Sequence, residues 1–149
     1  MAESVARLAH SSRPADLAAM FKQVCGDFWY FVLMAYCKLR RGEVWAARQA
    51  FHSEAMQHPH LLLRIESGNL DRWEGSSPAL DAERSLRPER LAGLDRCIPA
   101  PDSARLHAAL RGAAELGRDV SWSVAAEHSW FWPDQLADRI LSLLAASAE

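Results

Sequence analysis

The sequence has little net charge of either sign. Its 17 lysine and arginine residues nearly balance 19 aspartate and glutamate residues, which leaves a formal charge of -2 over 149 residues. Without a basic surplus the chain lacks the electrostatic attraction that holds a phosphate backbone, so we expect no nucleic-acid partner. A neutral or cationic small ligand fits this charge better.

Long apolar runs are also missing, and cysteines are few. The longest apolar run, residues 28–37, has ten residues, whereas a helix needs about 20 to span a bilayer. The N-terminus has no basic patch followed by an apolar stretch, so we expect neither export nor membrane anchoring. Cys25, Cys37 and Cys97 form no Cys-x-x-Cys pair. They indicate buried thiols in a reducing compartment, and we expect a cytoplasmic protein.

No segment alternates between apolar and polar residues as a half-buried strand would. Apolar residues instead recur at helical spacing, and proline or glycine separates the segments that contain them. The sequence therefore predicts an all-α fold, an up-and-down bundle of about five to six helices. A length of 149 residues suits one domain, so we expect residues 1–149 to form a single helical domain.

The first half of the chain predicts two long helices. Residues 15–39 contain no helix breaker except one glycine, and their run 28–37 is apolar on all sides, which indicates burial on all sides. Gly42 can end this helix. Glu43 opens a second helix towards His58, and a kink is expected where Pro59 interrupts the pattern.

The second half predicts three further helices after a less regular region. Residues 68–88 are rich in glycine, serine, proline and charge, which indicates a surface excursion with one helical turn. Pro88 can begin a helix, residues 106–124 have the spacing of a long one, and residues 134–146 read as a closing helix. Residues 1–13 are expected to form a flexible N-terminal segment.

Several short motifs follow one another in a fixed order. They are Gly-Asp-Phe-Trp-Tyr at 26–30, Lys-Leu-Arg-Arg-Gly-Glu at 38–43, His-Leu-Leu-Leu-Arg at 60–64, Cys-Ile-Pro at 97–99 and Trp-Pro-Asp at 132–134. Their order and spacing resemble the helical C-terminal half of aminoglycoside 6-adenylyltransferases, the streptomycin-modifying nucleotidyltransferases. The resemblance covers roughly residues 21–144. It implies a bundle of the nucleotidyltransferase substrate-binding type with a role in antibiotic resistance.

The catalytic half of that family would bring a Gly-Ser turn after a strand and an Asp-x-Asp pair for metal ions and nucleotide. The sequence has no Asp-x-Asp, and its one Gly-Ser pair, at 75–76, does not follow an apolar strand. We therefore expect no catalytic residue here, an absent N-terminal catalytic domain and no adenylylation by the chain alone. ATP and Mg²⁺ would bind only with a catalytic domain or subunit as partner.

The resemblance implies a ligand site made of acidic and aromatic side chains. Asp27 lies in an apolar helix, where an unpaired carboxylate is costly, so it meets either a basic partner or a ligand cleft. Because aminoglycosides are polycations, Asp27 is the first candidate. Trp29 and Tyr30 could offer a face for a sugar ring, with core packing as the alternative for at least one of them. Glu43 is either a cleft carboxylate or a helix-start charge.

Glu127 is the fifth candidate. It lies eight residues after Asp119 on the same helix face, near Trp122 and the aromatic corner at 130–132. Such an acidic, aromatic wall would suit an amino sugar, and a solvated helix face is the alternative. The histidines form neither an i,i+4 pair nor a His-Glu-x-x-His run, so we expect no metal site.

Two functions therefore stand side by side. The first is a substrate-binding helical domain for an aminoglycoside-like molecule, with an exposed apolar patch where a catalytic nucleotidyltransferase half would dock. The alternative is a free-standing helical interaction protein or homodimer without a small-molecule ligand.

Overall fold

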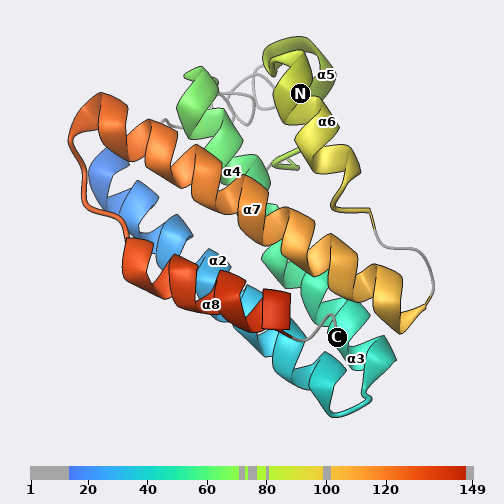
Figure 1. Cartoon of the computed structure of the whole chain (residues 1–149). Coiled ribbons are helices and arrows are strands. Elements are labelled where there is room, and N and C mark those ends of the chain that lie inside the picture. The colour runs from blue at the N-terminus through green and yellow to red at the C-terminus, as the bar shows by residue number, and fades with distance from the viewer. Residues whose placement is uncertain (1–13, 71–72, 74–76, 80, 99–101, 147–149) are drawn as a thin grey trace, which may run out of the picture.

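The computed structural model describes residues 14–70, 73, 77–79, 81–98 and 102–146. All regular elements in these ranges are helical (Figure 1), which confirms the predicted all-α class. In chain order they are α2 (Leu17–Arg40), α3 (Val44–Ala50), the π-helical turn η1 (Phe51–Ala55), α4 (Gln57–Ser67), α5 (Ala82–Ser85), α6 (Pro88–Asp95), α7 (Ser103–His128) and α8 (Asp134–Ala146). The segment 1–13, expected to be flexible, lies outside the described residues. None of the described helices is long and apolar enough to cross a membrane.

Helix α2 is the central element of the bundle. The Asp16 side chain caps its start by accepting a hydrogen bond from the Ala19 backbone N–H at 2.9 Å, and Gly42 ends the turn after it in the left-handed region. One expectation for this helix was wrong. Trp29 is fully buried, but Tyr30 is 57% exposed, so the apolar run is not covered on all sides.

The predicted second helix breaks earlier than its proline suggested. After α3, the chain widens into the π turn η1, in which the Met56 N–H bonds to the Phe51 carbonyl at 3.0 Å. In a continuous α-helix the Pro59 ring would conflict with the carbonyl four residues earlier, that of Ala55. The break therefore falls at Met56, and Pro59 becomes the third residue of α4.

Helices α2 and α7 run antiparallel and touch closely. The Cys25 thiol lies 3.5 Å from the Ser121 hydroxyl, to which it donates a hydrogen bond. One α-helical turn further along α2, the Phe28 ring lies against Gly117, where a Cβ atom would overlap it. Figure 1 shows the two long helices side by side, with α8 packed along them. The two helices therefore approach each other so closely here that only a glycine fits at position 117.

The remaining helices close the bundle at its edges. The Tyr36 hydroxyl donates to the Leu143 carbonyl of α8 at 3.4 Å. On the other side, the largely buried Glu66 carboxylate of α4 accepts a hydrogen bond from Arg90 of α6 at 2.9 Å. Between them, the described part of 68–88 contains one short helix, α5, as the sequence suggested.

Candidate functional site

Asp27 and Tyr30 form a small acidic and aromatic patch on α2. They are three residues apart and are therefore neighbours on the helix surface. Asp27 is half-buried, and the described residues provide no hydrogen bond or ion pair for its carboxylate. The Tyr30 ring packs edge-on against Phe31, with centroids 5.2 Å apart, and keeps more than half of its surface in solvent. A ligand approaching α2 could reach both side chains.

Trp29 has the core role that the sequence left open for one of the two aromatic residues. Its indole is fully buried and packs edge-on against Phe28 at 4.8 Å between centroids. Its Nε1 has no hydrogen-bond partner among the described residues. In this chain Trp29 therefore offers no open face to a sugar ring.

Glu43 lies far from this patch. It precedes α3, and its carboxylate accepts two hydrogen bonds from the Arg41 guanidinium, each 2.9 Å long. The hydrogen bond and positive charge of Arg41 lower the pKa of Glu43. Thirteen residues separate Asp27 from the end of α2 at Arg40, a distance of roughly 20 Å along the helix. The structure thus does not bring Glu43 next to Asp27.

A second acidic and aromatic surface, which we call the α7–α8 hollow, lies where α8 begins beside α7. It has a volume of about 440 Å³ and is lined by Arg118, Asp119, Trp122, Trp132, Asp134 and Asp138. Its three carboxylates outnumber its one guanidinium. No three histidine, cysteine or acidic side chains gather to hold a metal ion in the part of the chain that the structure describes. The lining suits an organic cation with an apolar face.

Part of the predicted acidic and aromatic wall lines this hollow. Asp119 and Trp122 line it, whereas Glu127 is exposed in the last turn of α7 outside it. Sequence reasoning missed Asp134 and Asp138. Their spacing of four residues on the polar side of the closing helix was the available signal.

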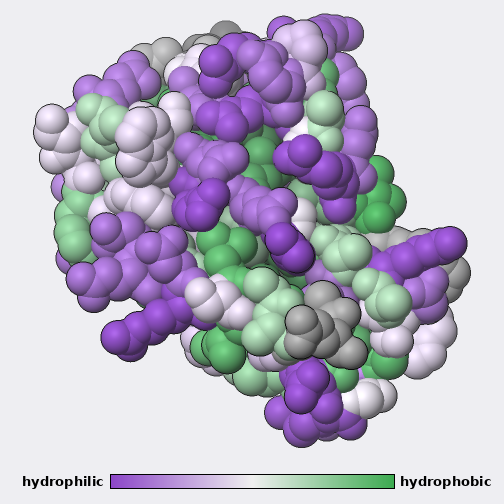
Figure 2. All heavy atoms as spheres, in the orientation of Figure 1, coloured by the Kyte–Doolittle hydropathy of each residue, from purple (hydrophilic) through white to green (hydrophobic). Residues whose placement is uncertain are grey.

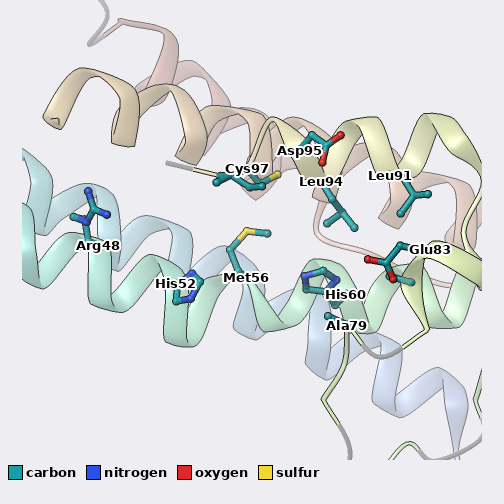
Figure 3. A pocket seen from close by; sticks show the side chains of 12 residues that line it. Arg48, His52, Met56, His60, Ala79, Glu83, Leu91, Leu94, Asp95 and Cys97 are labelled. Carbon is teal, nitrogen blue, oxygen red and sulfur yellow. The ribbon is translucent and has the colours of Figure 1, made fainter. Parts of the chain in front are cut away.

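A third feature, the α4–α6 cavity, has a volume of about 480 Å³ (Figure 3). Its lining combines apolar and polar side chains: Arg48, His52, Met56, His60, Ala79, Ala82, Glu83, Leu91, Leu94, Asp95, Cys97 and Ile98. No local pattern in the sequence predicts this cavity. None of the five predicted ligand residues lines it.

Two of the three cysteines are protected by burial. Burial raises the pKa of Cys25 to about 11 and the pKa of Cys97 to about 12. Cys37 is only partly buried. Because the thiolate is the reactive form, we expect iodoacetamide to alkylate Cys37 first in the folded chain and all three cysteines after unfolding. Mass spectrometry of tryptic peptides would measure this order, and fast labelling of Cys97 would contradict it.

The same two thiols predict a pH dependence of stability. In the unfolded chain they ionise near pH 8.5, whereas in the folded chain their pKa values are raised. Their contribution to the free energy of unfolding is therefore complete below about pH 8 and is lost as the pH rises above about 9. Urea unfolding of the natural chain and of a Cys25→Ala, Cys97→Ala variant would measure it. The variant should show the smaller fall between neutral and alkaline pH, and equal falls would contradict the argument.

Comparison with known proteins gives a match at the level of structure. No protein-family model and no curated protein sequence matches the chain. The crystal structure of an aminoglycoside 6-adenyltransferase from Bacillus subtilis is similar to it, with a TM-score of 0.75 and 18% sequence identity over 94% of this chain. The match covers 53% of that enzyme's chain, so this chain spans about half its length. The resemblance inferred from the motifs is thus confirmed as a shared fold.

Proposed function

We propose that this chain is the substrate-binding helical domain of an aminoglycoside-type nucleotidyltransferase and that its ligand is a cationic amino sugar. The observation that supports this most is the fold shared over 94% of the chain with an aminoglycoside 6-adenyltransferase. The sequence has no Asp-x-Asp pair, so nucleotidyl transfer would require a catalytic domain or subunit that brings ATP and Mg²⁺.

The α7–α8 hollow has the chemistry that such a ligand requires. Protonated amino groups form charge-assisted hydrogen bonds with carboxylates, and Asp119, Asp134 and Asp138 supply three. The apolar face of a sugar ring can pack on the exposed indole of Trp122. Oδ1 of Asp119 lies 3.6 Å from Nε of Arg118 in an exposed ion pair. Because such a pair contributes little to stability, a bound ammonium group can compete with the guanidinium for this carboxylate.

The patch of Asp27 and Tyr30 offers the same combination on α2, with a carboxylate that has no ion-pair partner in the described structure. No residue of α2 lines the hollow, so in our proposal Asp27 and Tyr30 are a separate binding surface for an amino sugar, and Glu127 extends the negative surface beyond the hollow. Glu43 joins only if the ligand displaces Arg41, which holds its carboxylate through two hydrogen bonds.

Calorimetric titration with streptomycin and other aminoglycosides tests the proposal. Asp119→Asn and Asp27→Asn should each weaken binding about tenfold, because each removes a charge-assisted hydrogen bond. Neither should change the midpoint of thermal unfolding by more than about 2 °C. Glu115→Gln, which removes an exposed charge elsewhere on α7, is the matched control and should bind normally. A loss of thermal stability with unchanged affinity would show that the altered carboxylate is structural.

The alternative of an interaction protein also has an observation in its favour. Several large apolar side chains are exposed, among them Trp45, which is 82% exposed, Ile98 and Phe131. On the face drawn in Figure 2, apolar residues lie in separate areas among hydrophilic ones. A stable homodimer in sedimentation velocity, together with no heat from any aminoglycoside with or without a catalytic partner, would favour this alternative and reject the amino-sugar proposal.

A further inference from the structure

The wall of the α4–α6 cavity depends on the π turn. Arg48, His52, Met56 and His60 follow one another at intervals of four residues and line the same cavity. In a continuous α-helix each interval of four rotates the side chain by roughly 40°, so His60 would point roughly 120° away from Arg48. A π turn holds more residues per turn and removes much of this rotation. Figure 3 shows the four side chains in a row along one side of the cavity.

The opposite wall is apolar and is held in place. Leu94 of α6 lies across the cavity from Met56, and Leu91 lies further along the same helix, on the side of Glu83 (Figure 3). The ion pair between Glu66 and Arg90 joins α4 to α6, and both side chains are largely buried. The end of α6 also packs closely against Gly112 of α7. A Cβ atom at Gly112 would lie only 3.0 Å from the Arg96 carbonyl oxygen at the end of α6. These two contacts hold the α6 wall of the cavity against α4 and α7.

His60 gives the cavity one directional polar group. Burial lowers the pKa of His60, so the imidazole is neutral near pH 7. Its Nδ1 is enclosed without a hydrogen-bond partner in the described residues. Since an unpaired buried N–H is costly, we place the ring proton on Nε2, which no described protein group engages. Nε2 can then donate to a molecule in the cavity.

The other polar groups give the cavity no strong charge preference. The positive charge of Arg48 is balanced by the negative charges of Glu83 and Asp95, both of which are exposed. The Arg48 guanidinium also lies over the Trp45 ring, 5.5 Å from its centroid. The Cys97 thiol donates to the Gly93 carbonyl at 3.3 Å. A polyanion or a polycation therefore finds no matching set of charges here.

We propose that the α4–α6 cavity binds an uncharged, mostly apolar ring compound with one hydrogen-bond acceptor, such as a ring carbonyl, for Nε2 of His60. The volume of about 480 Å³ lies within the range of small-molecule sites. The ring lies between Met56 and the two leucines of α6. This site is independent of the amino-sugar proposal, which rests on carboxylates of α2, α7 and α8.

A matched pair of probes tests the role of His60. 1-Indanone carries a carbonyl acceptor, and indane has the same bicyclic frame without it. Titration of the full-length ¹⁵N-labelled chain should shift the amide resonances of residues 52–58, of His60 and of residues 91–98. We expect 1-indanone to bind three- to tenfold more tightly than indane, the effect of one hydrogen bond. In His60→Phe the two probes should bind equally. Equal affinities in the natural chain would overturn the proposal.

Filling the cavity tests the location. Leu94→Trp should abolish binding of both probes, and Trp122→Ala in the α7–α8 hollow should leave it unchanged. If Leu94→Trp does not fold, Ile98→Trp serves instead, because Ile98 is exposed at the cavity margin. Unchanged affinity in a folded, filled variant would overturn the proposal. Absence of shifts in the natural chain up to the solubility limit of both probes would overturn it as well.

Discussion

Replacing Gly117 with alanine is expected to destabilise the chain by about 2–3 kcal/mol. The added methyl group would overlap the Phe28 ring, which lies against Gly117 where α2 crosses α7. Both helices would have to separate or the ring would have to leave its rotamer. This strain exceeds the gain of about 1 kcal/mol that alanine brings to a helix interior. Urea unfolding followed by circular dichroism would measure the change.

Gly26 provides the matched control for this prediction. It also lies inside a long helix, but it is exposed and a Cβ atom there would meet no atom within 4 Å. Gly26→Ala should therefore stabilise the chain by roughly 0.5–1 kcal/mol. Phe28→Leu should partly rescue Gly117→Ala, so the double variant should lose less than the sum of the single losses. A Gly117→Ala chain as stable as the natural one would contradict the close crossing.

The second large effect is expected at Glu66. The Glu66 side chain is 10% exposed and that of Arg90 is 17% exposed. Glu66→Gln would leave the Arg90 guanidinium without its counter-charge in a place with little solvent, and breaking a buried pair in this way costs about 3 kcal/mol or more. Thermal unfolding would measure the loss. It should be accompanied by weaker binding in the α4–α6 cavity, since α6 forms one of the cavity walls.

The control for Glu66 is the ion pair between Arg111 and Glu115 on α7. Its side chains are 49% and 41% exposed, so the same chemical change, Glu115→Gln, should cost less than about 0.5 kcal/mol. Equal losses in the two variants would mean that the Glu66 pair contributes no more than a surface contact.

The helices could be predicted because their signals are local. Asp134–Ala146 agrees with the predicted range, and α6 begins at Pro88 as expected. The exposure of Tyr30 beside the buried Trp29 could not be predicted in this way. An apolar run in one helix indicates how much surface must be covered, but which side stays open depends on where α4, α7 and α8 pack around α2.

The candidate sites, too, could be predicted only where their residues lie close together in the sequence. Asp119 and Trp122 share one helix, so their proximity followed from helical spacing. Asp134 joins them only because the chain reverses direction between α7 and α8. The α4–α6 cavity combines residues 48–60 with residues 79–98, and no local pattern relates these two segments. The contributions of Asp27, Glu43 and Glu127 to ligand binding stay predictions.

The π turn makes one wall of the α4–α6 cavity depend on the number of residues between α3 and α4. Inserting a single residue within Phe51–Ala55 would rotate every later side chain of α4 by about 100° about the helix axis. His60 would then leave the cavity, and the Glu66 carboxylate would leave the Arg90 guanidinium of α6. At this turn, an added residue would be far more damaging than a change of composition.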